Sequence, residues 1–484
     1  MRPVSSPHCD ILIFDIGDVL FSWSPKTPTN ISPKTLRAIT TSLVWGRFEC
    51  GQLSQSECYR LVAQEYALNA DDVALAFQYA RDSLQPDDSF ISFIHKLKAD
   101  SNNNLRIFAM SNISAPDYEV LRTKTADWSV FDKVFTSAAA GMRKPTLGFY
   151  KHVINTIGGD PASMIFVDDK AENVLSARSL GMHGVVFDKT TVRATLQYLV
   201  CNPLRRGMEF LDAHAGSLES VTETGILVEE NFAQLLILEA TRRRNLVNVS
   251  GNPKIGKWNF FREKPTLTTS VFPFDFDTTS LALTIVDHDY GLVNAVMDEM
   301  LQFRDEDGII QTYFDHKRQR TDPVVCVNVL SLFHAQGRAN ELLPTQAWVL
   351  DVLKHRAYLD GTRYYATPES FLFFLSRLLT ITDDEELHET FQPVLKERLQ
   401  ELVGASGDSM ALAMRITACA TVGMRNEVDL QKLLRMQHED GSWGPGIMYK
   451  YGSTGLGIGN RGLSTALALQ AICLAEGTGS PVAP

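Results

Sequence analysis

The sequence changes its pattern near residue 203, and this change limits the chain to two domains of different fold class. Before that point, short apolar runs alternate with longer segments of helical periodicity; the runs are residues 11–14, 105–110, 165–167 and 184–187. This alternation predicts a parallel α/β sheet. After that point, segments of helical periodicity follow one another with little β-type alternation, which predicts an all-α domain. We therefore expect an α/β domain over residues 1–204 and a helical domain over residues 205–484.

Charge and cysteine content exclude several classes of function. The 46 Lys and Arg residues against 57 Asp and Glu residues give a net charge of −11, which disfavours general binding to nucleic acid or anionic membranes. Seven cysteines without a C-x-x-C pair argue against a disulfide framework or a cysteine zinc site. The N-terminus lacks the apolar core of a secretory signal, and no apolar run is long enough to span a membrane. We expect a cytoplasmic protein without a nucleic-acid partner, and a homodimer is one assembly that stays open.

Polar residues follow three of the predicted strands. Asp15 follows the first, Ser111 the second and Asp168-Asp169 the third, while Lys144 lies in the loop between the second and third. Ligands of parallel α/β sheets bind at the carboxyl ends of the strands. A carboxylate can attack phosphorus, Ser and Lys can hold the transferring phosphoryl group, and further carboxylates suit Mg²⁺. This set therefore predicts phosphate chemistry at one edge of the sheet.

Residues 10–190 resemble the haloacid-dehalogenase-like hydrolases, in particular their sugar-phosphatase-like branch. The resemblance implies a Rossmann-like parallel sheet with a helical cap. It implies that Asp15 is the nucleophile and that Ser111 and Lys144 bind the phosphate. It also implies a Mg²⁺ cofactor that is held by Asp15, Asp168 and Asp169.

Position 17 departs from that family's pattern. Many of its phosphatases carry a second Asp two residues after the nucleophile, where it protonates the leaving group. Here the residue is Gly17, and Asp18 lies one residue further on. Losing a general acid commonly costs about 10²–10⁴-fold in rate, although a phosphate leaving group needs protonation less than an alkoxide does. The sequence leaves open whether this domain is active, slow or only structural.

The helical half contains a pair of acids at the start of a predicted helix, in the segment Asp275-Phe276-Asp277-Thr278-Thr279. The plain structural interpretation is a helix N-cap with acidic residues in the first turn. The flanking aromatic residues favour a second interpretation, because burial and a neighbouring carboxylate both raise a carboxyl pKa. Such a group is a Brønsted acid in an apolar pocket, and aromatic faces stabilise a cation without reacting with it.

This motif resembles the DxDTT motif of class II terpene cyclases, and the segment from Gln437 to Trp443 resembles their QxxDGSW motif. The order of the two halves is similar to that of the drimane-type sesquiterpene synthases, whose second domain is an all-α barrel. The resemblance implies that Asp277 protonates the terminal alkene of farnesyl diphosphate, that Asp275 orients or tunes it, and that Thr278 contacts the substrate. It also implies a bicyclic product of drimenyl or albicanyl type that keeps its diphosphate.

The diphosphate requires cations, and the basic residues near the acid motif and in the Gly-rich segment near the C-terminus are the candidates. We expect Lys254, Lys257, Lys264 and above all Arg461 to bind it, with Arg262 and Lys450 as further candidates and Mg²⁺ as a bridge. Aromatic side chains are expected to form the wall that faces the cation; the candidates are Trp258, Phe272, Phe274, Phe276, Tyr313, Tyr365, Phe373 and Trp443.

Three functions stay open at this stage. The first is a cyclase that forms a drimane-type diphosphate in terpenoid secondary metabolism. The second is a bifunctional cyclase and phosphatase that releases drimenol or albicanol. The third is a phosphatase whose helical domain binds prenyl groups without catalysing a reaction. Gly17 favours the diphosphate as the main product.

Overall fold

A computed structural model of the chain describes residues 9–101, 104–124, 126–251 and 254–477. The described residues from Cys9 to Cys201 form one compact unit, and those from Asn202 to Gly477 form the other. The boundary predicted from the sequence, between residues 204 and 205, lies within helix α11 (Pro203–Ala213) and stays a prediction. Among the described residues, no helix combines the length and the apolar character needed to cross a membrane.

The first unit is built on a five-stranded parallel sheet. Its strand order is β5 (Lys133–Thr136), β4 (Arg106–Ser111), β1 (Ile11–Phe14), β6 (Met164–Asp168) and β7 (His183–Val186). All four residues of the central strand β1 are buried, as expected when helices cover both faces of a parallel sheet. Because β4 and β6 flank β1, the carboxyl ends of these three strands lie side by side.

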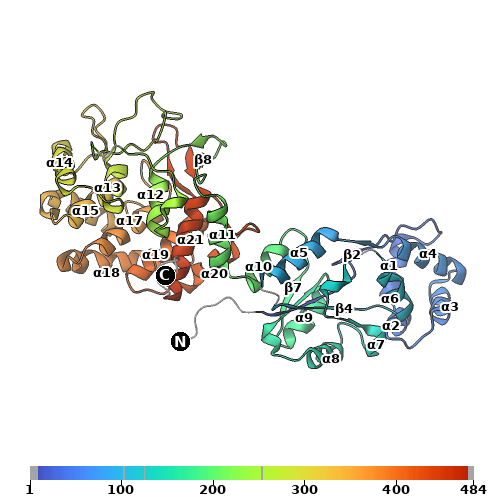
Figure 1. Ribbon diagram of the computed structural model, residues 1–484. Helices are drawn as coiled ribbons and strands as arrows, with labels where there is room; N and C mark the ends of the chain where they lie inside the picture. Colours follow the sequence, from blue (N-terminus) through green and yellow to red (C-terminus); the bar gives the residue numbers. More distant parts are fainter. Residues whose placement is uncertain (1–8, 102–103, 125, 252–253, 478–484) are drawn as a thin grey trace. The chain divides into compact units, whose positions relative to one another are not determined.

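Helices cover both faces of this sheet, and a helical cap with its own core is inserted after β1 (Figure 1). The cap consists of α1 (Pro33–Thr40), α2 (Leu43–Glu49), α3 (Gln55–Tyr66) and α4 (Ala70–Asp82), between the paired short strands β2 (Phe21–Ser22) and β3 (Gln85–Pro86). Each cap helix begins at a Ser or Asn whose side chain accepts a backbone N–H. The remaining helices are α5 (Asp88–Asp100), α6 (Ala115–Arg122), α7 (Ser137–Ala140), α8 (Leu147–Ile157), α9 (Ala171–Ser179) and α10 (Val192–Val200).

The second unit is a barrel of helices. Its inner ring is α12 (Phe232–Thr241), α13 (Phe276–Ile285), α15 (Pro323–Ala335), α17 (Pro368–Ile381), α19 (Ser409–Thr421) and α21 (Arg461–Glu476). Each of these helices packs on the next one in this order, and α21 packs on α12, so the ring closes. Long stretches of α15, α17 and α19 are buried without interruption, as expected for helices surrounded by others.

Outer helices and a small sheet complete the barrel (Figure 1). Helices α11, α16 (Leu343–Lys354), α18 (Glu385–Leu402) and α20 (Glu427–Arg435) pack outside the ring, and α14 (Tyr290–Met300) follows α13. An antiparallel sheet has the order β10 (Ile447–Lys450), β11 (Gly457–Gly459), β8 (Ser220–Thr222) and β9 (Leu227–Val228). The all-α barrel expected from the sequence is therefore present, with this small sheet in addition.

The Gln437–Trp443 segment acts as a structural clamp. Arg206 on α11 donates to Gln437 Oε1 at 2.9 Å, and Gln437 Nε2 donates to the Gly441 carbonyl at 2.8 Å. The fully buried Trp443 donates from its indole nitrogen to the Leu433 carbonyl at 2.7 Å. These bonds connect α11 to α20, and the Trp443 backbone N–H extends the clamp to α21 by donating to Thr465 Oγ1 at 3.1 Å. The motif thus stabilises the barrel and does not line a reaction site.

Gly441 is the tightest point of this clamp. Its φ is +90°, and a Cβ atom there would lie 2.3 Å from the Arg206 carbonyl oxygen. Gly423 has a comparable φ of +68°, but a Cβ atom there would have no neighbour within 4 Å. We expect Gly423→Ala to cost about 1 kcal/mol in backbone strain, and Gly441→Ala to cost about 2–3 kcal/mol more because of the clash. Urea unfolding of both variants measures the difference in the free energy of unfolding. Equal losses would contradict the close approach of Gly441 to the Arg206 carbonyl.

Candidate active sites

The hydrolase-like site lies at the carboxyl edge of the parallel sheet. Asp15 follows β1, Ser111 ends β4 and Asp168 ends β6, so the order of the strands places all three side by side. All three are buried. Lys144 comes from the loop before α8 and is 1% exposed. The structure therefore brings together four residues that the sequence spreads over more than 150 positions.

Lys144 connects the two central carboxylates. Its Nζ atom lies 2.8 Å from Asp15 Oδ1 and 2.6 Å from Asp168 Oδ2. Burial alone would lower the pKa of Lys144, but Asp15 and Asp168 raise it above its ordinary value. Burial raises the pKa of Asp15 to about 6 against the opposing effect of Lys144. The site thus holds a cation between two carboxylates, which favours a bound phosphoryl group.

Two asparagines that sequence reasoning did not assign to the site position its charged groups. Asn112 accepts the Lys144 backbone N–H at 2.8 Å and donates to the Lys144 carbonyl at 2.9 Å. Asn173 donates to both oxygens of Asp168, at 2.9 and 3.0 Å. Asn112 directly follows Ser111, and Asn173 follows Asp169 closely in the sequence. The sequence signal that could have identified both is their position shortly after the end of a strand.

The donor set at this edge fits a magnesium ion. Carboxylate oxygens of Asp15, Asp168 and Asp169 all lie within 4.8 Å of one another. Hard oxygen ligands at this spacing suit Mg²⁺, which usually takes only a few carboxylates and keeps several waters. Burial also raises the pKa of Asp169, and the charges of Asp168 and Asp18 add to this shift while those of Lys170 and Lys144 oppose it.

Position 17 offers no acid to this site. Gly17 is exposed, and a Cβ atom there would have no neighbour within 4 Å, so a side chain would fit. Asp18 is exposed and has a positive φ of 56°. The backbone N–H of Asp18 donates to the Phe21 carbonyl, which fixes the turn.

The second site is a cavity of about 420 Å³ at one end of the helical barrel. Its lining residues include Phe232, Asp277, Val325 and Tyr365, which lie at or just before the first turns of α12, α13, α15 and α17. The positive ends of several inner helices therefore surround it. The volume lies within the usual range for small-molecule sites.

Asp277 is a half-buried acid on the wall of this cavity. Asn328 on α15 donates to its Oδ1 at 2.6 Å, and the Tyr365 hydroxyl donates to its Oδ2 at 2.5 Å. Burial raises the pKa of Asp277 to about 8, although the bonds from Tyr365 and Asn328 oppose the shift. No cationic partner offsets the burial among the described residues. The side chain is therefore largely protonated at neutral pH.

Two further carboxyl groups tune Asp277. Asp275 caps α13 by accepting the Thr278 backbone N–H at 2.6 Å, and burial raises its pKa to about 6. Asp322 caps α15 by accepting the Val324 N–H at 3.0 Å, and burial raises its pKa as well. Their charges push the pKa of Asp277 further upward. The sequence identified Asp275 and Thr278, and both line the cavity, but Asp322 carried no motif.

Aromatic rings form most of the remaining wall. The lining contains Phe232, Phe260, Phe261, Phe272, Tyr313, Tyr364, Tyr365, Tyr449 and Tyr451. Phe272, Tyr313 and Tyr365 were predicted from the sequence. The other five predicted wall residues lie outside this lining. Four of them are buried in the core, namely Trp258, Phe276, Phe373 and Trp443, and the half-buried Phe274 packs beside Lys257.

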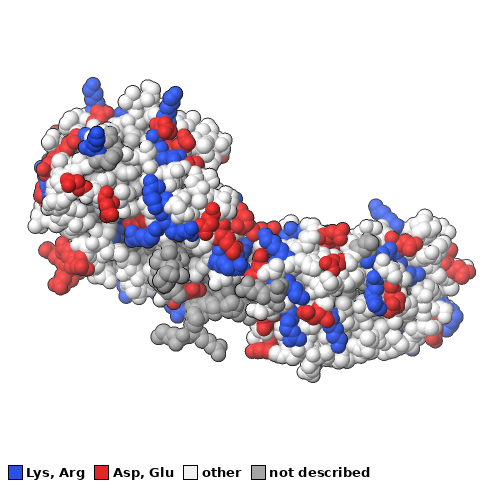
Figure 2. Space-filling model, viewed as in Figure 1, with Lys and Arg blue, Asp and Glu red and all other residues white. Residues whose placement is uncertain are grey.

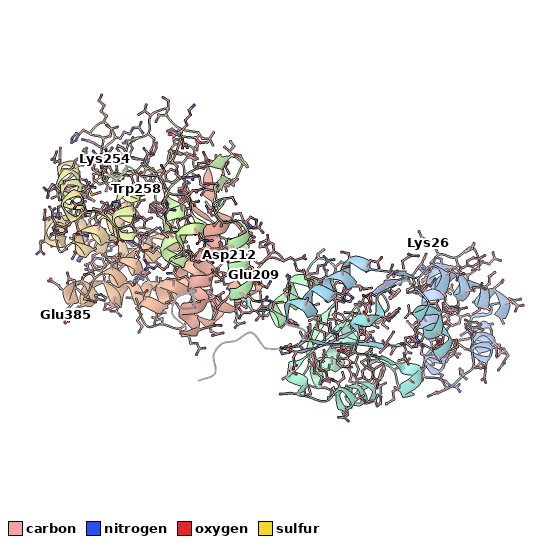
Figure 3. All side chains as sticks on the ribbon, viewed as in Figure 1. Lys26, Glu209, Asp212, Lys254, Trp258 and Glu385 are labelled. Atoms are coloured by element: carbon pink, nitrogen blue, oxygen red, sulfur yellow. The ribbon has the colours of Figure 1, made fainter. Side chains whose placement is uncertain are left out.

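Lys254, Lys257, Lys264 and Arg461, which the sequence predicts to hold a diphosphate, do not line this cavity. Lys254, which Figure 3 labels, is exposed, and so is Lys264. Lys257 pairs with Glu299 at 2.9 Å. Arg461 pairs with Asp440 at 2.7 Å in the Gln437–Trp443 clamp. Their positions thus do not support the binding role that the sequence suggested.

Four other cations line the cavity instead: Arg318, Arg320, Arg363 and Lys450. Arg320 and Arg363 are exposed and the other two are half-buried, so they form its rim. Elsewhere on the face that Figure 2 shows, acidic and basic side chains are interspersed. Of these four, the sequence singled out only Lys450, because the other three sit in loops without a recognisable pattern.

The two sites define an α/β hydrolase-like domain joined to a helical domain with a half-buried acid in an aromatic cavity. The family model described as the sesquiterpene cyclase astC-like C-terminal domain matches residues 204–336. The drimenol cyclase drtB of Aspergillus calidoustus is 48% identical over 472 residues, which cover 97% of this chain and 88% of that protein. The chain therefore belongs to the drimane-type sesquiterpene cyclase family.

The first unit has relatives of its own. The sesquiterpene phosphatase astK of Aspergillus oryzae is 40% identical over 173 residues, which cover 36% of this chain and 87% of that protein. A solved HAD-like family hydrolase from Porphyromonas gingivalis has 22% identity and a TM-score of 0.32, and the match covers 40% of this chain and 98% of that one.

The hydrolase-like site makes a prediction about stability. Lys144→Met leaves Asp15 and Asp168 buried without their cation, which should cost about 3–5 kcal/mol at pH 8. The variant raises the folded-state pKa of Asp15 above its wild-type value of about 6. A carboxyl group whose pKa is raised on folding destabilises the folded state when it is ionised and no longer does so once it is protonated. The loss in the free energy of unfolding of Lys144→Met should therefore shrink as the pH falls to 5. Calorimetry of the full chain measures this, with the exposed Lys151→Met as the control.

Proposed function

We propose that the helical domain cyclises farnesyl diphosphate by protonation and forms a drimane-type bicyclic diphosphate. The observation that carries this proposal is Asp277, a protonated carboxyl on the wall of an aromatic cavity. An alkene is a very weak base, so its protonation requires an acid that is shielded from water, because water would otherwise take the proton first. The family of the chain supports the substrate class.

The environment of Asp277 suits the transfer of its proton to the substrate alkene. Its carboxyl proton goes to the terminal alkene carbon, and the alkene's electron pair forms the new C–H bond. The carboxylate that remains accepts hydrogen bonds from Asn328 and Tyr365 and lies in the first turn of α13. These groups are in place before the reaction, so they stabilise the developing negative charge without reorganisation.

The cavity also fits the cation that follows. Its aromatic rings present π-faces that stabilise positive charge and add no nucleophile. With the acid deep in the cavity and the cations at its rim, the substrate's tail would enter first and its diphosphate would stay outside. Arg318, Arg320, Arg363 and Lys450 then hold the diphosphate through charge-assisted hydrogen bonds.

A second activity, phosphate removal, is supported by the Asp15–Lys144–Asp168 arrangement. Asp15 attacks the terminal phosphorus, while Ser111 and Lys144 bind the phosphoryl oxygens. Mg²⁺, held by Asp15, Asp168 and Asp169, would neutralise phosphoryl charge there. Because Gly17 provides no proton for an alkoxide, this site favours cleavage between the two phosphates, whose leaving group is itself a phosphate. The cytoplasmic location and the homodimer stay predictions.

Incubation of the purified chain with farnesyl diphosphate and Mg²⁺ tests both activities. The wild type should give a drimane-type alcohol after alkaline phosphatase treatment. Asp277→Asn should lower its formation at least 10³-fold, because the amide has no acidic proton. Asp15→Asn should abolish phosphate release and leave cyclisation intact, so each variant controls for the other. Unchanged cyclisation by Asp277→Asn would contradict the assigned acid, and farnesol as the sole product in a parallel sample without alkaline phosphatase would support a phosphatase with a non-catalytic helical domain.

The cations at the rim give a separate prediction. Arg318→Gln and Arg363→Gln should each raise KM for farnesyl diphosphate about 10-fold or more, since a hydrogen bond between charged groups contributes about 1.5–3 kcal/mol. Arg461→Gln should leave KM unchanged, because Arg461 is paired with Asp440 outside the cavity. The KM values from steady-state kinetics show whether the rim cations or Arg461 bind the diphosphate. A large effect from Arg461→Gln alone would restore the sequence-based assignment.

A further inference from the structure

A second carboxyl group touches the cavity through a tyrosine. Glu230 is fully buried just before α12, and the hydroxyl of Tyr449, which lines the cavity, donates to its Oε1 at 2.5 Å. Ser220 also donates to Oε1, at 2.6 Å, and the Ala233 backbone N–H donates to Oε2 at 2.9 Å. Among the described residues, no cationic side chain forms an ion pair with Glu230.

This pair repeats the arrangement of Asp277 and Tyr365. Tyr365 and Tyr449 face each other as an antiparallel backbone bridge. The ring of Phe232 packs against both, with ring centroids 6.2 Å from Tyr365 and 5.9 Å from Tyr449. The two carboxyl groups lie at the starts of the neighbouring inner helices α13 and α12. The cavity therefore has two separate carboxyl–phenol pairs, and the proposed protonation uses only one.

Cyclisation also needs a base. After two rings close, the bicyclic cation must lose a proton from a carbon next to the charge. That carbon belongs to the second ring, whereas Asp277 protonates a carbon of the first ring, so a second group has to accept the proton. Glu230 accepts hydrogen bonds from Ser220, Tyr449 and the Ala233 backbone N–H, and these donors favour its carboxylate form. Burial acts in the opposite direction and raises the pKa of Glu230, so its carboxylate is a stronger base than that of an exposed glutamate.

We propose that Tyr449 and Glu230 form the base that ends the cyclisation. The C–H electron pair becomes the new double bond, and the proton goes to the Tyr449 hydroxyl oxygen. The hydroxyl's own proton moves to Glu230 Oε1, so the cation is discharged and Glu230 becomes neutral. Tyr449 is the residue that touches the substrate, and Glu230 acts through it. This inference rests on the proposed cyclase activity.

Product analysis of Tyr449→Phe and Glu230→Gln tests the inference in the full chain. Both variants keep the acid Asp277, so farnesyl diphosphate consumption should fall less than about 10-fold. The wild-type alkene should fall at least 10-fold as a share of the bicyclic products and be replaced by other double-bond isomers or by a hydrated diol. Substrate deuterated at the carbons that can lose the proton should show a larger isotope effect on product ratio in the variants. An unchanged product ratio would overturn the proposal.

Two controls separate this role from a structural one. Tyr358 is equally buried but does not line the cavity, so Tyr358→Phe should leave the product ratio unchanged. Glu230→Asp keeps a carboxylate and should recover part of the wild-type ratio, which a purely structural loss of packing would not explain. If the wild type forms no bicyclic product, the cyclase proposal itself fails. If the wild type cyclises and both variants keep its product, only the base is wrong.

Discussion

Removing carboxyl groups from water is the constraint on which both sites depend. A buried carboxylate is costly unless a cation or several hydrogen bonds compensate it. At the sheet edge, Lys144 compensates Asp15 and Asp168, and this pairing favours charged groups that can attack phosphorus or hold a metal. In the barrel, Asp277 has hydrogen bonds but no cation, so it keeps its proton. The pairing with Lys144 therefore suits Asp15 to act as a nucleophile, whereas Asp277, which has no such partner among the described residues, suits the role of an acid.

The barrel provides this environment because its inner helices begin around the cavity. Helix starts have unsatisfied backbone N–H groups, and acidic side chains satisfy them without any cation. Asp275, Asp322 and Glu230 each accept a backbone N–H at the first turn of an inner helix. A closed ring of helices therefore concentrates acids at one end and apolar rings between them, which is what alkene protonation requires.

Much of the fold could be predicted from the sequence, because buried strands of a parallel sheet are apolar over their whole length. The runs at 11–14 and 165–167 lie within one residue of β1 and β6. Strand β5 (Lys133–Thr136) was missed, since it pairs only with β4 at the edge of the sheet and has no apolar run.

The site residues also divide into those that a local sequence motif identifies and those that only the fold brings together. Asp275 and Asp277 share a local motif, so the sequence identified them. Their partners come from distant positions: Asn328 is 51 residues from Asp277, and Tyr365 is 88 residues away. Only the closed ring brings them together, and the rim cations depend on the same packing. Because the acid lies deep and the cations lie at the mouth, a bound diphosphate is kept away from the proton donor. Among its described residues, the barrel itself offers no group placed to cleave that diphosphate, so a chain that is to remove phosphate needs a second site, and the Asp15–Lys144–Asp168 arrangement is the candidate for it.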